Sequence, residues 1–306
     1  MKSGNHIQYL PHSQIDKLKW DDCIETAENG LIYAYSFYLD HMSENWDALV
    51  LNDYEVVMPL TWKKKYSIKY LYQPFLTAQS GIFGKNITEK IITDFIESIP
   101  DSFRYIDITL NTGNIFSIPS GFAIHRVNYT LDLNRSYSEL KSNYRENIVR
   151  NIKKAEASGY TFEKDFDVEI IIKLAIQQMN NHDKTSSAQV ARFRSLFNYL
   201  REKNMAVTRG IKVNDVMLAS CVFFSSHNRF YYILVGNHPD GKTIGASHAL
   251  IDAFIKEHSG TNRLLDFEGS DIPNLAFFYS SFGAKQEVYP ALKINRLPFY
   301  LKWLKK

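Results

Sequence analysis

The stretch RFYYILVGNHPDGKTIGASHALIDAFIKEH, residues 229–258, decides the fold of this chain. Its first part is a dense run of apolar and aromatic residues, which predicts a buried strand ending at Gly236. A polar loop follows, and apolar residues at helical spacing then predict a helix over 246–258. The order therefore places a glycine-containing loop directly at the start of a helix.

The loop brings Gly241, Lys242, Gly245, Ala246 and Ser247 to the expected helix start. A helix N-terminus presents free N–H groups and a partial positive charge, and glycine lets a phosphate approach the backbone. Lys242 adds a cation. The loop is therefore either a cradle for a pyrophosphate or a glycine-rich turn that caps the helix. It is not a Walker loop, because the pattern GxxxxGK[ST] is absent.

A second stretch, DFEGSDIPNLAFFYSSFGAK at 266–285, leads from a strand into a compact aromatic helix that stops at Gly283. Asp266 and Glu268 leave the strand toward the same edge, and Tyr279 lies on the helix. A tyrosine hydroxyl can donate a proton to a leaving thiolate, and a carboxylate or a bound water can take one from an amine. The alternative is that Tyr279 belongs to the core, as we expect of the phenylalanines around it.

Composition limits the function classes. The chain has 306 residues, 45% of them hydrophobic, which is enough for two cores. Its net charge of +3 argues against a wholly basic nucleic-acid binder, and we expect no DNA partner. The sequence shows neither a secretory h-region nor a run long enough to span a membrane, so we expect a cytoplasmic protein. Cys23 and Cys221 are too few for a metal site, and Cys221 is either a buried thiol or a nucleophile.

Both halves of the chain show the same order of elements: helix, antiparallel strands, helix, strand, helix or turn, strand. A capping box at Ser136 and Glu139 opens what we predict to be one long helix up to Gly159. We therefore expect an N-terminal domain over 1–135, a linking helix over 136–159 and a C-terminal domain over 160–293. The basic, apolar tail, residues 294–306, either packs on the first domain or docks on a membrane surface.

The linking helix carries several cations, including Arg145. They form either a solvated face or a site for phosphate, from a tRNA end, a nucleotide-linked sugar or coenzyme A.

The second half resembles the GNAT acyltransferase fold. In that family a [Q/R]xxGx[G/A] loop binds the pyrophosphate of coenzyme A, and here Lys242, Gly245 and Ser247 occupy those positions. Tyr279 and Gly283 match the family's Tyr-x-x-x-Gly-Phe ending, with Ala284 in place of the phenylalanine. The resemblance implies acyl-CoA or acetyl-CoA as donor, bound by the loop and by strand 229–236, where Val235 lies. It also implies Tyr279 as the acid that protonates the thiolate. Our hypothesis for the base is Glu268, or a water that it holds.

The whole chain resembles the Fem-like tandem GNAT proteins, including the BioF2-like group. Three separated blocks carry the likeness: VVMPLTWKKKYSIKYLYQPFLTAQSGIF, LDLNRSYSELKSNYRENIVRNIKKAEASGY and LLDFEGSDIPNLAFFYSSFGAK. The expected fold is α+β, in αβα layers, with two GNAT-like domains that each have a mixed, mostly antiparallel sheet flanked by helices. The resemblance implies an acceptor bound between the domains, where we expect Gln73, Thr77, Gln79, Arg145 and His182 to contact it.

The preferred hypothesis is transfer of an acyl group from acyl-CoA to an amine or hydroxyl of a small molecule or a cell-envelope precursor. A second hypothesis is a Fem-type transferase that takes an amino acid from aminoacyl-tRNA and acts on a peptidoglycan precursor peptide. Many Fem-type enzymes carry Phe-Lys where this chain has Phe278-Tyr279, which favours the acyl-CoA donor. A third is a non-catalytic tandem protein that binds a precursor. At most, we expect peripheral contact with a membrane.

Overall fold

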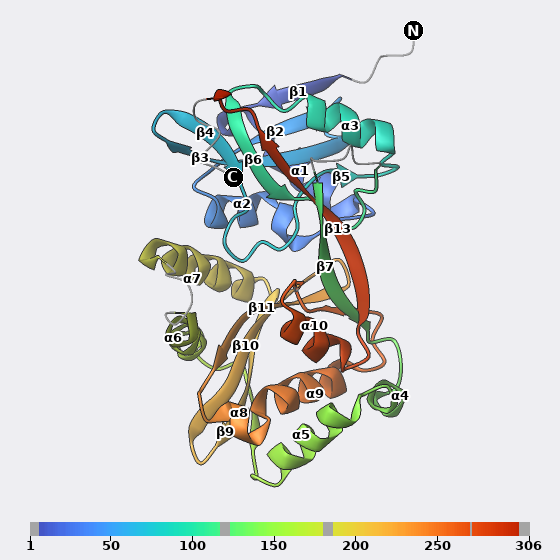
Figure 1. Cartoon of the computed structure of the whole chain (residues 1–306), viewed down its shortest axis with the longest axis vertical. Helices are drawn as coiled ribbons and strands as arrows, with labels where there is room; N and C mark the ends of the chain where they lie inside the picture. Colours follow the sequence, from blue (N-terminus) through green and yellow to red (C-terminus); the bar gives the residue numbers. More distant parts are fainter. Residues whose placement is uncertain (1–5, 117–122, 180–185, 270, 300–306) are drawn as a thin grey trace. The chain divides into compact units, whose positions relative to one another are not determined.

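A computed structural model describes residues 6–116, 123–179, 186–269 and 271–299 of the chain (Figure 1). The chain divides into two compact units. Unit 1 comprises residues 1–126 and 288–306, and unit 2 comprises residues 127–287. The chain therefore passes from one unit to the other twice, first within strand β7 (Ala123–Asp132) and again within strand β13 (Lys285–Asn295).

This division differs from the expected one, because the predicted linking helix is part of unit 2 and is broken in two. Helices α4 (Tyr137–Ser142) and α5 (Glu146–Glu156) replace the single helix. The capping box at Ser136 is present. The break follows from tertiary contacts: Tyr144 is buried against Phe282, and the Arg145 N–H donates to the Ser281 carbonyl at 2.9 Å. Helical spacing alone carries no sign of these partners.

Unit 2 is built on a sheet with the strand order β7-β12-β11-β10-β9-β8. Every neighbouring pair is antiparallel except β11 with β12, which is parallel. Its remaining strands are β8 (Thr161–Lys164), β9 (Ala206–Val213), β10 (Val216–Ser226), β11 (Arg229–Asn237) and β12 (Leu264–Asp266). Its other helices are α6 (Val168–Met179), α7 (Ser187–Glu202), α8 (Gly241–Ile244), α9 (Ala246–His258) and α10 (Pro273–Ser280).

Helices cover both faces of the sheet in unit 2. Successive side chains of a strand point to opposite faces. On β10, Phe223 stacks on Phe254 of α9 with ring centroids 3.7 Å apart, whereas Phe224 stacks on Phe193 of α7 at 6.0 Å. Helix α6 packs on β11 so closely that a Cβ at Gly236 would lie 2.6 Å from the Ile171 carbonyl oxygen. The expected αβα layering is confirmed.

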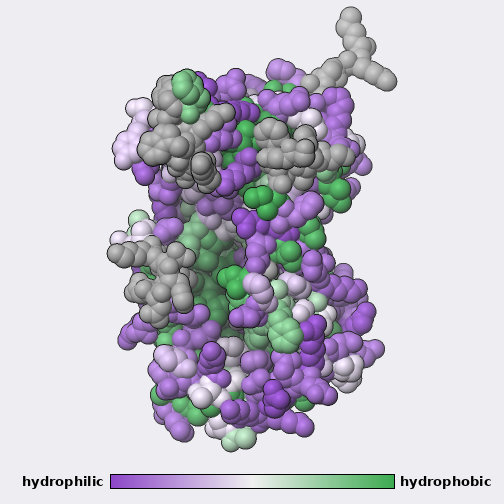
Figure 2. Space-filling view, viewed as in Figure 1, coloured by the Kyte–Doolittle hydropathy of each residue, from purple (hydrophilic) through white to green (hydrophobic). Residues whose placement is uncertain are grey.

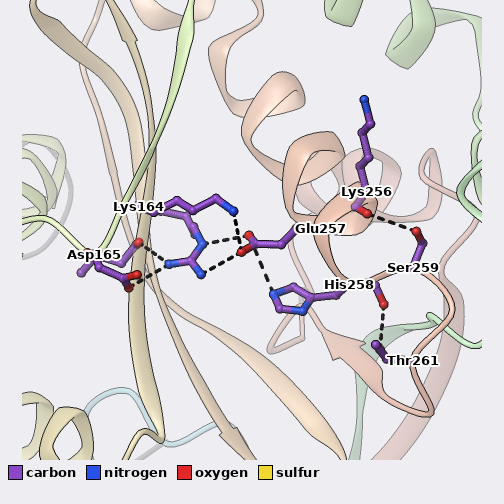
Figure 3. A network of polar contacts seen from close by, with 9 residues as sticks. Lys164, Asp165, Lys256, Glu257, His258, Ser259 and Thr261 are labelled. Atoms are coloured by element: carbon purple, nitrogen blue, oxygen red, sulfur yellow. Dashed lines mark hydrogen bonds and ion pairs between the residues drawn. The ribbon is translucent and has the colours of Figure 1, made fainter.

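The C-terminal end of α9 is fixed by a polar network (Figure 3). The nearly buried Arg209 guanidinium donates to both oxygens of Glu257, at 2.9 and 3.0 Å, and to Asp165 at 2.9 Å. The Lys164 ammonium also donates to Glu257. Next to it the His258 ring packs on Phe230 and Phe254, and burial lowers the pKa of this imidazole to about 4. The network holds α9 against β8 and β9, so the opposite end of α9 has a defined place beside the end of β11.

Unit 1 has a sheet with the order β1-β2-β3-β4-β6-β13, and β5 lies beside β3. The hairpin predicted around Asn52 and Asp53 is confirmed, and the parallel pair is β4 with β6. Its strands besides β13 are β1 (Ile7–Leu10), β2 (Asn45–Leu51), β3 (Val56–Lys65), β4 (Ile68–Tyr72), β5 (Phe83–Gly84) and β6 (Phe103–Thr109). Its helices are α1 (Lys17–Thr26), α2 (Ser36–Met42) and α3 (Glu89–Glu97), with short 3₁₀ turns at His12–Gln14 and Ile32–Ala34.

The tail lies in unit 1 as far as residue 299. There the Arg296 guanidinium donates to the carbonyl oxygens of Ile99 and Pro100, and Leu297 is buried. The rest of the tail, 300–306, lies outside the described residues. Among the helices of the described part of the chain, none is both long and apolar enough to cross a membrane.

Candidate active site

The parallel pair β11–β12 opens partway along its length. Three residue pairs join the two strands, from Arg229 with Leu264 to Tyr231 with Asp266. Strand β12 then ends, whereas β11 continues to Asn237. The backbone of β11 beyond Tyr231, including the half-buried Val235, therefore extends past the last residue of the strand beside it. Such a segment can offer backbone N–H groups to a ligand along the edge that faces away from β10, because none of the described strands pairs with it on that edge.

A buried ion pair holds the closed end of this opening. Asp266 is 1% exposed and accepts hydrogen bonds from the Arg229 guanidinium at 2.5 Å and from the Asn128 amide at 2.9 Å. Burial alone would lower the pKa of Arg229, but the Asp266 carboxylate raises it above its ordinary value. With both oxygens engaged, Asp266 ties β7, β11 and β12 together.

Glu268 leaves the strand two residues later, in a conformation that is unusual for its type. Its φ is +66°, and its N–H donates to Asp266 Oδ1 at 2.8 Å. The half-buried carboxylate acts electrostatically on Tyr279 and on Cys221, since its charge raises the pKa of both groups. Non-glycine residues in the left-handed region are uncommon and cluster at functional sites. Glu268 and Tyr279, the two predicted catalytic residues, are thus close enough to interact electrostatically.

Tyr279 lies on α10 and is 7% exposed. Its ring stacks on Phe267, with centroids 4.7 Å apart, and meets the ring of Tyr232 edge-on at 6.4 Å. Tyr232 is the first residue of β11 beyond the paired segment. Burial, and then the neighbouring Cys221 and Glu268, raise the pKa of Tyr279, so its phenol stays protonated near neutral pH. Tyr279 is both a core residue and a neighbour of the opening, so the two interpretations of this residue are compatible.

Sequence reasoning missed part of this cluster. The thiol of Cys221 is fully buried and close enough to Tyr279 and Tyr232 to affect their pKa values, and its own pKa is raised by burial. The apolar strand pattern around Cys221 indicated burial, but not these neighbours. Asn128 lies 138 residues from Asp266 in sequence, and no local signal could have paired them.

The predicted pyrophosphate loop is more helical than expected. Gly241 and Lys242 belong to α8, a single turn that was too short to show helical periodicity. Gly245 joins α8 to α9 with a φ of +78°, and a Cβ there would lie 2.6 Å from the Asn151 carbonyl oxygen. A glycine is therefore required at position 245 partly for structural reasons, because α5 packs directly against this residue.

The remaining loop residues differ in what they offer a ligand. Lys242 is exposed, whereas Ala246 is buried at the start of α9. The Ser247 hydroxyl donates to Asn237 Oδ1 at 3.0 Å and so links α9 to the end of β11.

The polar residues predicted to contact an acceptor in the first half serve their own loop. The Gln73 side chain donates to the Thr77 carbonyl and accepts from the Thr109 N–H. Gln79 is 1% exposed and accepts from the Thr112 N–H. Thr77 is also buried. Their polar groups therefore stabilise the loop, and acceptor binding by them stays a prediction.

Arg145, predicted to contact the acceptor, is exposed and lies over the ring of Phe277 at 4.9 Å. Apolar side chains reach the surface over α10 beside it, as Figure 2 shows; Ile272, Leu275 and Phe277 are the exposed ones. The other predicted contact, His182, lies outside the described residues. Within the described ranges, no group of three or more His, Cys, Asp or Glu side chains could hold a metal ion.

Comparisons with known proteins support the fold. Residues 142–267 match the family model for an acetyltransferase (GNAT) domain. A search of curated proteins by sequence finds no match.

Three solved structures share the fold over most of the chain. FemX matches with a TM-score of 0.66 at 12% identity, covering 97% of this chain and 99% of FemX. The tandem GNAT protein from the clavulanic acid biosynthesis pathway matches with a TM-score of 0.54 at 11% identity, covering 96% of this chain and 99% of that one. L-PGS from Bacillus licheniformis matches with a TM-score of 0.50 at 9% identity, covering 85% and 87%.

The family match falls on the part of the chain that holds the opening and its loop, and the structural matches extend over both units. The resemblance to the Fem-like tandem GNAT proteins is thus confirmed at the level of the fold, and this chain has a tandem GNAT fold.

Proposed function

We propose that unit 2 binds an acyl-CoA and transfers its acyl group directly to an amine or hydroxyl of an acceptor. One observation carries the proposal: β11 continues beyond the end of β12, and Tyr232, its first residue without a partner in β12, contacts the buried Tyr279. A strand with unused backbone groups beside a protonated phenol suits a reaction that needs N–H donors for a carbonyl and an acid for a leaving group.

Two parts of the site would hold the donor. Backbone N–H groups of β11 near Val235 would bind the thioester carbonyl and stabilise the oxyanion that forms on attack. The pyrophosphate would lie at the junction of α8 and α9, where Ala246 and Ser247 supply backbone N–H groups and Lys242 supplies a cation. Gly241 and Gly245 shape this junction, since their own N–H groups donate to the carbonyls of His238 and Gly241. The short link between β11 and α8, residues 238–240, keeps the two parts on one segment of chain.

In the proposed reaction, the acceptor nitrogen or oxygen attacks the thioester carbon. Glu268, or a water that it holds, takes the proton of the attacking group. As the carbon–sulfur bond breaks, Tyr279 donates its proton to the sulfur and leaves free coenzyme A. The proton that Glu268 gained then returns to Tyr279 through solvent, so the enzyme needs no covalent intermediate.

Calorimetric titration with coenzyme A and acetyl-CoA tests the donor. We expect saturable binding that weakens about tenfold in the Lys242→Ala variant, because one charge-assisted contact to the pyrophosphate is lost. Lys203→Ala, which removes an exposed cation at the end of α7, is the control and keeps full affinity. Unchanged affinity in Lys242→Ala would refute the proposed pyrophosphate site. If neither compound binds, acyl-CoA is not the donor.

A second candidate is transfer from aminoacyl-tRNA to a cell-wall or lipid precursor. The exposed cations of α5 favour it, and so do the similarities to FemX and L-PGS at the level of fold. Contacts with tRNA release counterions, so binding would weaken steeply as salt rises. Titration with tRNA at two salt concentrations separates the two candidates: steep salt dependence together with no affinity for coenzyme A would favour the tRNA donor.

A further inference from the structure

Helix α5 carries a polar stripe next to its buried stripe. Ile148, Ile152 and Ala155 are buried in the core of unit 2. Asn147, Arg150, Asn151 and Lys154 follow the spacing i, i+3, i+4, i+7, which places their side chains along one line of a helix. We call these four residues the α5 stripe.

The α5 stripe passes over the junction between α8 and α9. Asn151 is its contact point: a Cβ at Gly245 would lie 2.6 Å from the Asn151 carbonyl oxygen and 3.0 Å from its Cβ. The Asn151 amide donates to the Asn147 carbonyl at 2.8 Å, which holds that side chain along the helix. Arg150 and Lys154 are the exposed cations of the stripe, one residue before Asn151 and three after it.

The cations near the junction of α8 and α9 come from two different helices. A coenzyme A molecule carries a pyrophosphate and, at its nucleotide end, a 3′-phosphate monoester. The junction itself supplies one cation, Lys242, for the pyrophosphate, and the α5 stripe supplies two more from a different helix. We propose that Arg150 and Lys154 bind the 3′-phosphate of the donor, so that the α5 stripe makes the site selective for coenzyme A over dephospho-coenzyme A. This inference rests on the proposed function, since it names the part of the acyl-CoA that α5 recognises.

A simpler role for these cations is to stabilise the helix itself. Lys153 and Lys154 both lie in the last turn of α5, where positive charge complements the helix dipole. Lys153, however, points about 100° away from Lys154, because an α-helix has 3.6 residues per turn. Lys153 lines a shallow depression of about 370 Å³ together with Tyr144, Glu146, Val149 and Arg150. It is therefore a matched control for Lys154, with the same charge, the same dipole contribution and a different direction.

The test is a titration of the full chain and its Arg150→Gln, Lys154→Gln and Lys153→Gln variants with coenzyme A and with dephospho-coenzyme A. We expect the unsubstituted chain to bind coenzyme A about tenfold more tightly than dephospho-coenzyme A. Arg150→Gln and Lys154→Gln should each remove most of this preference and leave the affinity for dephospho-coenzyme A unchanged. Lys153→Gln should keep the full preference.

The outcomes separate the inference from the function on which it rests. Equal affinity for the two compounds in the unsubstituted chain, or an unchanged preference in Arg150→Gln and Lys154→Gln, overturns the inference while the acyl-CoA function stands. An equal loss in Lys153→Gln also overturns it, because the effect would then belong to the overall charge of α5. Binding of neither compound overturns both. Melting temperatures of the variants show whether each one is folded.

Discussion

The two units differ at their parallel strand pairs, β4–β6 in unit 1 and β11–β12 in unit 2. In unit 2, three residues (238–240) separate β11 from α8, and the edge of β11 beyond Tyr231 stays open. In unit 1, sixteen residues (73–88) separate β4 from α3. The same order of elements therefore leads to an open edge in one unit and to a long inserted loop in the other.

The inserted loop of unit 1 is bonded to the chain that follows β6. The Thr109 hydroxyl donates to the Ala78 carbonyl, and the Asn111 amide donates to the Ser80 carbonyl. Asn114 both accepts from the Ile82 N–H and donates to the Ile82 carbonyl. Asn111 and Asn114 are buried, so the loop is fixed in place beside the end of β6. Similar folds thus do not imply similar sites, because one loop decides whether the sheet stays open.

This comparison predicts one donor per chain. Because the loop after β4 is fixed in place beside the end of β6, we expect acetyl-CoA to bind with a stoichiometry of one, in unit 2. Calorimetric titration of the full chain measures the number directly. A stoichiometry of two would show that the loop of unit 1 leaves or shares its place, and would break the comparison.

If only unit 2 is catalytic, its activity should depend on Tyr279. We expect Tyr279→Phe to lower turnover about 1000-fold with little change in acetyl-CoA affinity, since the acid for the leaving thiolate is lost. The release of coenzyme A, followed with a thiol reagent in the presence of an amine acceptor, measures turnover. The control is Tyr105→Phe, which removes a buried tyrosine hydroxyl from β6 of unit 1. Equal turnover in Tyr279→Phe and the unsubstituted chain would leave Tyr279 with a packing role only.

We predict a large loss of stability when the buried ion pair at the closed end of the opening is broken. Asp266→Ala leaves the Arg229 guanidinium buried without its carboxylate, so we expect the free energy of unfolding to fall by about 4 kcal/mol. The exposed pair Lys90–Asp94 of unit 1 is the contrast, and Asp94→Ala should cost about 0.4 kcal/mol.

Urea denaturation followed by circular dichroism measures both changes. Trp20, Trp46 and Trp62 lie in unit 1, and residues 127–287 hold no tryptophan, so tryptophan emission reports on unit 1 separately. Similar costs in the two variants would mean that Asp266 is not the buried anchor of β11 and β12.

Much of this fold could be predicted from the sequence, because its signals are local. The hairpin at Asn52, the capping box at Ser136 and the helix that ends before Gly283 all depend on neighbouring residues, and all three are present. The break at Arg145 could not be predicted, since its cause is the carbonyl of Ser281. The observed limits of the two units also differ from the predicted ones because of contacts between distant residues. The chain returns to unit 1 through β13 after most of unit 2 is complete.

The candidate site was less predictable than the fold. Residue types made Tyr279 and Glu268 the candidates, because few side chains can serve as acid and base beside a strand end, and their catalytic roles stay predictions. The sequence could not separate two roles for Gln79, because a polar residue in a loop has the same pattern whether it faces a ligand or bonds to Thr112. Only the three-dimensional partner of the side chain separates these two cases.

Among the main variants, the smallest expected loss of stability concerns the glycines of the two loops that follow β11 and β4. In unit 2, Gly245→Ala forces a side chain into left-handed backbone and against the Asn151 carbonyl oxygen, so we expect a loss of about 3 kcal/mol. In unit 1, a Cβ at Gly81, where φ is +97°, would lie 2.3 Å from Asn114 Oδ1, and we expect a similar loss. Gly159→Ala is the control, because its φ is +67° with no atom within 4 Å of the added Cβ, and it should cost about 1 kcal/mol.

The two glycine variants should differ in function even where they agree in stability. Gly245→Ala moves the junction of α8 and α9 away from α5, so acetyl-CoA affinity should fall together with the free energy of unfolding. Gly81→Ala loosens a loop that serves only unit 1, so the affinity should stay unchanged under conditions where the chain is folded. Denaturation and calorimetry on the same samples measure both quantities. If Gly81→Ala instead weakened acetyl-CoA binding as much as Gly245→Ala, the donor would depend on unit 1, and the contrast between an open and a filled sheet would have to be abandoned.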